Sequence, residues 1–473
     1  MTAIKEALFG TYLSSDILPY RCESPMLSFV SPDHQQFDIS NKQLSKHVLL
    51  IGGIGMGKTN TFNFIIDDLN DQMTASGGSD VMLIFDTKGD FKKEFFNRTT
   101  DILIGNSSEF SSITSYWNIF REIEYGGIFR EEKELMAKEI AKLLFEDRKN
   151  TSQPFFSTAA CDIFSKVLIG TMRQFWNQPL YQQLEEQLRH CNPRSPEGRR
   201  IIRTQREMFN QCAHYYNNKM LVNDILQQYT YKEYIELLDD ERNPDFKSAL
   251  SYIGKGETPQ SLGVLGELNS MVNDYFIGVF AGYEDGRDVS IRQLIHDKGG
   301  RKIFIEYDLS IGEILTPVYK LLVDLGLKEA LGRSHSEGNV FLIVDEFKLL
   351  PKLTHIDDAL NFGRSLGIKA VVGIQNIKQL EDIYGETRGQ VIAAGFSNVI
   401  SFRMTDEASR QYISNLYGKN FLRLEYTGSD GHPKPFEREG YTVEDWQLMA
   451  LNVGQAVVGL SGYPPFYFQF PEW

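Results

Sequence analysis

The sequence contains few cysteines and no long apolar run. Its four cysteines, Cys22, Cys161, Cys191 and Cys212, lie far apart and form no C-x-x-C pair, so a disulfide framework is not expected. No apolar stretch approaches the roughly 18 residues that a membrane-spanning helix needs. The first residues also lack the basic and apolar segments of a secretory signal. These absences predict a cytoplasmic protein with reduced thiols and no transmembrane segment of its own.

Positive charge is also scarce, since the 473 residues carry a net charge of −14. This balance argues against a protein coated with nucleic-acid-binding surface. It does not exclude a ring or channel that gathers basic side chains on one inner face, because the local field steers a polyanion. With 42% hydrophobic and 24% charged residues, the composition is that of a globular protein, and the length suits two or three domains.

The most specific motif lies in residues 47–71, HVLLIGGIGMGKTNTFNFIIDDLND. The apolar run 48–51 predicts a buried strand, and a helix follows the glycine-rich turn. Phe62, Ile65, Ile66 and Leu69 recur on one face of that helix. The turn itself fits G-x-x-x-x-G-K-[ST], the phosphate-binding loop or P-loop. The predicted nucleotide-binding residues are Gly52, Gly53, Ile54, Gly55, Met56, Gly57, Lys58, Thr59 and Asn60.

The residue types of this turn suit a triphosphate. We expect the four glycines to adopt φ > 0, so that backbone N–H groups approach phosphate oxygens. The positive end of the following helix points at the same anion. Lys58 is expected to reach the β- and γ-phosphates, and the Thr59 hydroxyl to ligate Mg²⁺. The alternative is a chance glycine turn, but strand, motif and helix are all in register. The sequence therefore predicts binding of ATP and Mg²⁺.

A second motif, NVFLIVDEFKLLP at residues 339–351, places two acids after an apolar strand. Asp345 and Glu346 would lie at the carboxyl end of that strand, where open α/β sheets bind ligands. Asp345 is expected to hold Mg²⁺ through water, and Glu346 to orient and polarise the water that attacks the γ-phosphate. The alternative is an acidic pair that caps the next helix. A carboxylate directly after the metal-binding one favours hydrolysis over transfer to a second substrate.

Two polar residues flank the next predicted strand. Arg364 precedes it, and Gln375 stands at its end. Gln375 is placed to sense the γ-phosphate, and Arg364, if it projects from the rim, to reach a neighbouring subunit's nucleotide as an arginine finger. The bland alternatives, a surface ion pair for Arg364 and a helix cap for Gln375, stay open on mechanism alone.

The sequence pattern predicts two kinds of region, one of alternating strands and helices and one that is all helical. Strands are predicted at 48–51, 82–85, 102–104, 302–309, 340–344, 370–374, 399–402, 456–460 and 466–470, with a hairpin near 27–30 before them and Tyr116, Trp117 and Asn118 in a loop. Strands that alternate with helices indicate a mostly parallel sheet covered on both faces. Residues 128–275 show helical spacing instead. We therefore expect an α/β nucleotide-binding domain in two parts, 1–127 and 276–473, interrupted by an all-helical domain, 128–275.

Several motifs occur together in an order and spacing that is informative. They are GGIGMGKT, FDTKGDF, YWNIF, IVDEFKLLPKL, GRSLGIKAVVGIQN, QLEDIYGE and the late segment GLSGYPPFYF. This set resembles the coupling-protein ATPases of bacterial conjugation and type IV secretion, the TraG/TraD kind, within the FtsK and HerA group of motors. The resemblance covers most of the chain from His47 onward and includes the helical insertion. It departs from the family at Thr87, where proline is usual, and keeps Asp86, Lys88 and Gly89.

The resemblance implies a RecA-like P-loop fold, a hexameric ring and a DNA substrate. It gives Lys58, Glu346 and Gln375 the family's catalytic roles, Thr59 and Asp345 its metal roles, and Arg364 its trans-acting arginine role. Such proteins usually begin with transmembrane helices, which are not expected in this chain. We therefore expect it either to act at the inner face of the membrane through a secretion or relaxosome partner, or to belong to a soluble branch whose substrate is not conjugative DNA. The leading function is a DNA translocase. A receptor ATPase for secreted proteins and a HerA-like motor in DNA processing or phage defence remain alternatives.

The densest basic stretch lies within the helical insertion. It comprises Arg189, Arg194, Arg199, Arg200, Arg203 and Arg206, interleaved with Glu185, Glu186, Glu197 and Glu207. These arginines could contact DNA phosphates, although such a run is more often a solvated helix face with paired charges. Tyr215, Tyr216 and Lys219 follow closely; core packing of the tyrosines is favoured over stacking on bases.

Overall fold

The computed structural model describes residues 2–13, 20–107, 109, 111–149, 153–254, 257–333, 337–427 and 432–473. The chain forms two compact units. Unit 1 comprises residues 1–101, 298–304 and 330–473, and unit 2 comprises residues 102–297 and 305–329. This division rests on compactness, so the domain bounds 1–127, 128–275 and 276–473 stay a prediction.

A nine-stranded sheet, counted over the described residues, carries the order β16-β15-β12-β4-β11-β10-β5-β9-β6. Its strands are β4 (Val48–Ile51), β5 (Val81–Asp86), β6 (Ile102–Ile104), β9 (Arg301–Glu306), β10 (Val340–Val344), β11 (Ile368–Ile374), β12 (Asn398–Phe402), β15 (Gln455–Gly459) and β16 (Phe466–Gln469). The run β12-β4-β11-β10-β5 is parallel, and β15 and β16 extend it antiparallel. The predicted, mostly parallel sheet is confirmed.

The five parallel strands are buried along their whole length. Both faces of such a strand contact protein, which explains why the sequence shows continuous Val, Ile and Leu runs instead of alternation. The parallel pairing also brings all their carboxyl ends to one edge. That edge is where the motifs after β4, β10 and β11 meet.

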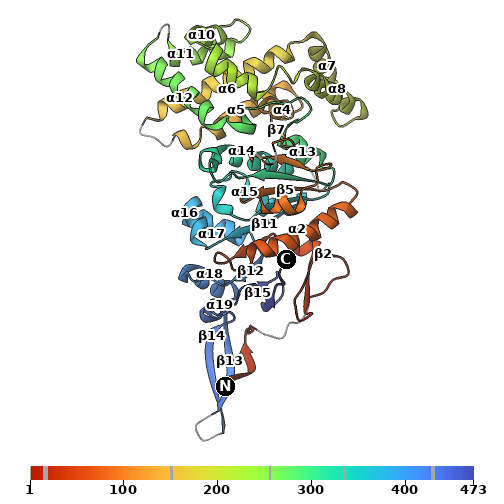
Figure 1. The fold of residues 1–473 in the computed structure, drawn as a ribbon, viewed down its shortest axis with the longest axis vertical. Coiled ribbons are helices and arrows are strands. Elements are labelled where there is room, and N and C mark those ends of the chain that lie inside the picture. The colour runs from red at the N-terminus through yellow and green to blue at the C-terminus, as the bar shows by residue number, and fades with distance from the viewer. Residues whose placement is uncertain are drawn as a thin grey trace. The chain divides into compact units, whose positions relative to one another are not determined.

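Helices of unit 1 surround this sheet (Figure 1). They are α1 (Asn41–Leu44), α2 (Lys58–Ala75), α3 (Asp90–Phe95), α15 (Ile356–Leu366), α16 (Lys378–Tyr384), α17 (Glu386–Ala394), α18 (Glu407–Tyr417) and α19 (Asp445–Met449). The predicted apolar face of α2 is confirmed, since Phe62, Ile65, Ile66 and Leu69 are fully buried. Burial of these four side chains fixes α2, and with it the P-loop, against the sheet.

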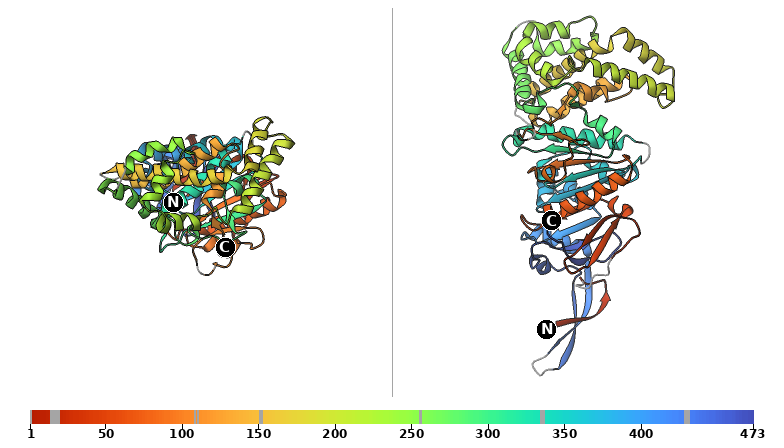
Figure 2. Two further views of the ribbon diagram at one scale, coloured as in Figure 1. Left: turned by 90° about the horizontal axis from the view of Figure 1, so that it is seen from above. Right: turned by 45° about the vertical axis from the view of Figure 1, so that its right-hand side comes forward.

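Two further pieces of unit 1 are antiparallel. The expected N-terminal hairpin is present as β2 (Pro25–Val30) and β3 (Gln36–Ser40). A second sheet, β1-β13-β14, was not expected; it joins β1 (Thr2–Phe9), β13 (Lys419–Thr427) and β14 (Pro433–Tyr441). Figure 1 and the right-hand view of Figure 2 show β13 and β14 as two long neighbouring strands, with β1 beside them.

Unit 2 is mostly helical and runs from the orange through the green to the teal part of the chain (Figure 1). Its helices are α4 (Ile119–Glu124), α5 (Arg130–Leu144), α6 (Pro154–Trp176), α7 (Pro179–Arg189), α8 (Pro196–Cys212), α9 (Asn218–Asn223), α10 (Tyr231–Leu238), α11 (Leu250–Ile253), α12 (Pro259–Tyr275), α13 (Ile291–Asp297) and α14 (Gly312–Leu331). Within residues 128–275, every regular element of the described residues is helical.

The expectation of a loop at residues 116–118 is wrong. Tyr116 and Trp117 form a short strand, β7, that pairs in parallel with β8 (Asp288–Val289), and Asn118 caps α4. The Asn118 carboxamide accepts the N–H of Phe120 at 3.0 Å and donates to Asp288 Oδ2 at 3.0 Å. A polar residue that looks like a turn signal therefore serves as a helix cap.

Among the described residues, α6 alone is long and apolar enough to cross a membrane by length and composition. Its apolar window is 72% buried inside the structure. Ile163, Phe164 and Leu168, among others on this helix, are fully buried. Protein contacts thus cover the surface that lipid would otherwise cover, as in a core helix.

Candidate nucleotide site

The P-loop lies between β4 and α2. Gly55 has φ +73° and Gly57, the residue before α2, has φ +115°, so both stand in the region that glycine tolerates and other residues do not. The expectation that Gly53 also adopts a positive φ is wrong, because its backbone does not enter that region in the structure. Not every glycine of the motif is therefore required by the backbone conformation of the loop.

Lys58 is the first residue of α2 and is buried. Its Nζ donates to the carbonyl oxygens of Gly52 at 2.5 Å and Gly53 at 3.0 Å. Burial lowers the pKa of Lys58, while the carboxylates of Asp345 and Glu346 act in the opposite direction. The ammonium group is therefore held at the floor of the P-loop, among oxygen atoms that phosphate oxygens can replace.

Thr59 and Asp345, the two predicted metal residues, lie side by side. The Thr59 hydroxyl donates to Asp345 Oδ2 at 3.1 Å. Burial raises the pKa of Asp345 to about 6; a divalent cation favours the ionised form and would lower it. Hydroxyl and carboxylate oxygens are the donors that Mg²⁺ takes together with water and phosphate, so these residues fit the ion.

Glu346 and Gln375 form the next contact in the site. Gln375 Nε2 donates to Glu346 Oε2 at 2.8 Å. The other oxygen, Glu346 Oε1, is buried and accepts no hydrogen bond from the residues that the structure describes. One carboxylate oxygen is thus fixed and the other is available to a water molecule. The alternative function of Gln375 as a helix cap does not occur, since its side chain points to the acidic pair.

The strand order explains this convergence. β11, which ends before Gln375, lies between β4, which leads into the P-loop, and β10, which ends before Asp345. All three strands are parallel neighbours. Their carboxyl ends open into a cavity of about 680 Å³ that Lys58, Thr59, Asp345, Glu346 and Gln375 line together.

The residues of the FDTKGDF segment have two different functions. The buried Asp86 carboxylate accepts the N–H groups of Gly89 and Lys92, each at 2.8 Å, and so shapes the turn after β5. Burial raises the pKa of Asp86, and these hydrogen bonds counteract the rise. Lys88 is exposed and lines the cavity with Thr87. Lys88 is therefore a second cation at the site, beyond the predicted set.

Arg364 lies at the opposite edge of the sheet. It stands on α15, just before β11, whereas Lys58 follows the carboxyl end of β4. The seven residues of β11 separate these edges by about 20 Å. Arg364 is exposed, lines a cavity of about 570 Å³ with Lys42 and Lys369, and has no ion-pair partner within the described part of the chain. The structure therefore does not bring Arg364 to the P-loop of its own chain.

The remaining predicted residues take varied positions. Ile54 is 77% exposed at the mouth of the cavity, and the Met56 carbonyl accepts the N–H of Gly454 at 3.1 Å. Asn60 lines the cavity, but its side chain binds the backbone of Pro471 and Trp473. Sequence reasoning missed the late residues of the lining, Val453, Gly454 and residues 469–473, because they carry no phosphate-binding motif.

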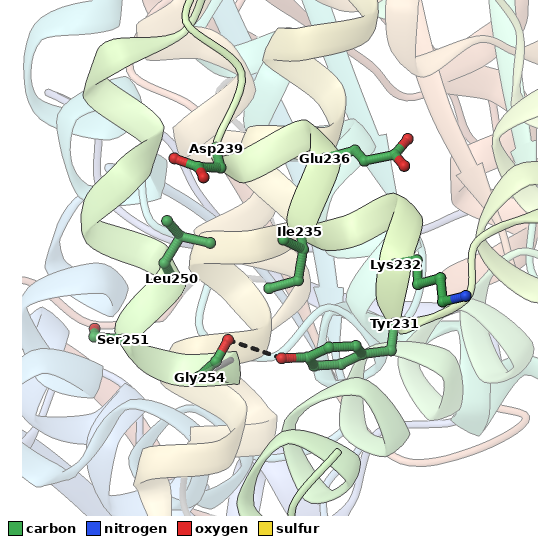
Figure 3. Close-up of a pocket in the computed structure, with 8 residues that line it drawn as sticks. All are labelled: Tyr231, Lys232, Ile235, Glu236, Asp239, Leu250, Ser251 and Gly254. Atoms are coloured by element: carbon green, nitrogen blue, oxygen red, sulfur yellow. Dashed lines mark hydrogen bonds between the residues drawn. The ribbon is translucent and has the colours of Figure 1, made fainter. Parts of the chain in front are cut away.

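A second cavity, of about 630 Å³, lies in unit 2 between α10 and α11. Ile235 and Leu250 face each other across it, and the Tyr231 hydroxyl donates to the Gly254 carbonyl at 2.8 Å (Figure 3). Its charged lining consists of Lys232 and two acids, Glu236 and Asp239. One lysine beside two carboxylates does not suit a triphosphate, so this cavity is not the nucleotide site.

The fold and the first cavity together define a RecA-like P-loop nucleotide-binding protein with an all-helical insertion. The sequence model described as "Type IV secretion-system coupling protein DNA-binding domain" matches residues 34–192 and 260–434. The chain belongs to this family of type IV secretion coupling proteins. No curated protein matches the sequence.

Solved structures support the same fold. The bacterial conjugative coupling protein TrwBdeltaN70 in its unbound form is 18% identical, with a TM-score of 0.68, over 99% of this chain and 96% of that one. TrwB with ADP and Mg²⁺ is 17% identical, with a TM-score of 0.63, over 99% and 97%. VirB4 of Thermoanaerobacter pseudethanolicus is 13% identical, with a TM-score of 0.51, over 97% and 99%. The predicted RecA-like architecture is thus confirmed.

Proposed function

We propose that this coupling protein hydrolyses ATP and uses the free energy to move DNA for conjugation or type IV secretion. One observation carries the enzymatic part: Lys58, the Thr59–Asp345 pair and the Glu346–Gln375 pair converge on a single cavity at the ends of three parallel strands. Family membership supports the DNA substrate. The nucleotide complexes solved for TrwB support ATP as the ligand.

The residues suggest a division of labour. Lys58 exchanges its two carbonyl contacts for phosphate oxygens. Thr59 and Asp345 would hold Mg²⁺, which would neutralise phosphate charge when bound. Gln375 fixes one oxygen of Glu346, so that the free oxygen orients the attacking water toward the γ-phosphate. The chain's own contribution is thus positioning and electrostatics.

Arg364 acts between subunits in this proposal. Its place at the edge opposite to Lys58 prevents action on its own nucleotide and suits a ring, in which one subunit's far edge meets the next subunit's site. A homo-hexamer is the assembly that we propose. Arg364→Ala mixed with Glu346→Gln should regain partial turnover, because some interfaces then combine an intact arginine with an intact glutamate. No recovery at any mixing ratio would contradict this role.

DNA contact is proposed for the exposed arginines of α8. Arg199, Arg200 and Arg203 are exposed and have no ion-pair partner among the residues that the structure describes. Two arginines of the same run are engaged internally: Arg189 pairs with Glu131 at 2.7 Å, and Arg206 stacks on Tyr125. Three free guanidinium groups on two successive turns of α8 suit phosphates spaced along a backbone.

The tyrosines beyond α8 differ from each other. Tyr216 packs on Phe175 and Phe209, as expected. Tyr215 is 65% exposed, so the expectation of core packing is wrong for it. This exposed ring, beyond the C-terminal end of α8, offers a surface on which a base can stack.

The direct test is the ATPase rate as a function of protein concentration, with and without single- and double-stranded DNA. A ring motor predicts a rate per chain that rises with concentration and with DNA, and Lys58→Ala should abolish it. Activity that ignores DNA but follows a bound protein tail would instead favour a receptor for secreted proteins. We propose that the protein works at the inner face of the membrane, through a secretion or relaxosome partner.

A further inference from the structure

The P-loop is tied to a late segment of the chain by backbone hydrogen bonds. Gly454 N–H donates to Met56 O at 3.1 Å, and Phe470 N–H donates to Gly454 O at 2.9 Å. The contact is close, since a Cβ on Gly57 would meet Gly454 Cα at 3.1 Å. Residues 469–473, here called the strap, therefore begin directly behind the phosphate-binding loop.

Asn60 holds the strap on α2. Its Nδ2 donates to the Pro471 carbonyl at 2.7 Å, and its Oδ1 accepts the Trp473 N–H at 2.8 Å. Both ends of the carboxamide are used, so the side chain bridges two backbone groups of the strap. Asn60 lies on the first turn of α2, one residue after Thr59.

An aromatic contact anchors the end of the strap. The Trp473 ring lies edge-on to Phe64 of α2, with centroids 5.0 Å apart, and tilted against Phe95 of α3 at 5.5 Å. Trp473 nevertheless stays 44% exposed. Aromatic pairs of this kind stabilise a contact beyond the area that they bury. The strap is thus a built element with polar and apolar attachments.

The lining of the cavity combines two kinds of side chain. Its polar part includes a lysine, a threonine, carboxylates and a glutamine from the P-loop and from the ends of β10 and β11, which suit phosphates and a cation. Most of its apolar part comes from Val453, Phe470, Pro471 and Trp473, and the strap also contributes Gln469 and Glu472. A nucleotide likewise combines a charged triphosphate with a flat, weakly polar base.

We propose that the strap is the wall against which the nucleoside lies, and that Asn60 is a positioning residue that holds this wall on the P-loop helix. The inference rests on the proposed function of the cavity. In this proposal the Asn60 side chain positions the strap and does not contact phosphate directly. A loosened strap must be ordered again by each nucleotide, which weakens nucleoside binding.

The test compares two ligands in the full chain: ADP, which carries the nucleoside, and inorganic tripolyphosphate, which does not. Displacement of a fluorescent ADP derivative gives both affinities in the presence of Mg²⁺. Asn60→Ala and Trp473→Ala should each raise the Kd for ADP about tenfold, or 1.4 kcal/mol, and leave the Kd for tripolyphosphate unchanged. Asn63→Ala on the same helix and Trp446→Ala, another exposed tryptophan, should change neither.

A second readout uses energy transfer from tryptophan to an N-methylanthraniloyl group on the ribose. The signal should largely disappear in Trp473→Phe and persist in Trp446→Phe. If Asn60→Ala and Trp473→Ala leave ADP binding unchanged, or weaken both ligands by the same factor, the strap is not the nucleoside wall. If the unaltered protein binds neither ligand, the proposed nucleotide site itself fails. Lys58→Ala, which should lose both ligands, separates these two failures.

Discussion

The hydrogen bond from Gln375 to Glu346 allows a quantitative prediction. Gln375→Ala removes the donor that lies 2.8 Å from Glu346 Oε2 and leaves neither carboxylate oxygen with a partner, since Oε1 already has none among the described residues. A hydrogen bond to a charged group contributes about 1.5–3 kcal/mol. If the bond serves to orient Glu346 in the transition state, its loss lowers kcat by roughly 10- to 150-fold.

The assay is single-turnover release of inorganic phosphate at saturating ATP, with ATP and ADP affinities measured in parallel. Gln375→Ala should slow the hydrolysis step and leave the ratio of ATP to ADP affinity unchanged. If Gln375 instead contacts the γ-phosphate, ATP binding should weaken relative to ADP binding. Gln411→Ala, on the exposed face of α18, is the matched control. A hydrolysis rate within twofold of the unaltered protein would refute the positioning role.

Three further outcomes are expected. Burial lowers the pKa of His47 to about 4, so the free energy of unfolding should fall by about 3 kcal/mol as the pH drops from 6.5 to 4; His47→Gln should flatten this slope in urea titrations. Gly373→Ala places a Cβ 2.2 Å from the backbone carbonyl oxygen of Asp345, directly after β10, and should lower the free energy of unfolding by about 1–3 kcal/mol. Gly266→Ala, whose Cβ would meet no atom within 4 Å, is the control and should have no such effect. Arg199→Glu with Arg203→Glu should reduce DNA stimulation and its salt dependence, with basal ATPase unchanged.

The sign of the His47 effect follows from its contacts. The imidazole is buried, with Nδ1 accepting the Ala370 N–H at 3.1 Å and Nε2 facing the Leu360 carbonyl at 3.1 Å. This arrangement suits the neutral ring, so the native state resists protonation. The unfolded chain binds the proton near pH 6.5. Stability is therefore complete above that pH and is lost as the pH falls toward the native pKa.

The nucleotide-binding half of the protein could be predicted because its signals are local. The buried run at 48–51, the glycines after it and the face of α2 lie within a few turns of one another, and each reflects a period or conformation that a short segment dictates. The position of Asp345 and Glu346 could be predicted in the same way, because the apolar run of the buried strand β10 ends directly before Asp345. Gln375 lies between the P-loop and the acidic pair because β11 pairs with both β4 and β10. No local pattern indicates that pairing, and the family resemblance was needed to assign a role to Gln375.

Other features could not be predicted because they depend on distant partners. Asn60 and Pro471 are 411 residues apart, and no pattern near either one indicates the contact. The exposed hairpin of β13 and β14 shows little apolar alternation, because few of its described side chains are buried. Gly53 lies in a motif that suggests a positive φ, yet the loop reaches its shape without one.

We propose that residues 193–259, one of the stretches outside the family match, contribute to substrate choice. The family match stops at residue 192 and resumes at residue 260, and the residues between them form α8 to α11. This stretch contains the free arginines of α8 and the cavity between α10 and α11, whereas every residue of the phosphate site lies in unit 1. In this proposal the nucleotide and the DNA are bound on separate surfaces of the chain. Substitutions on α8 should accordingly change the response to DNA and leave the affinity for nucleotide alone.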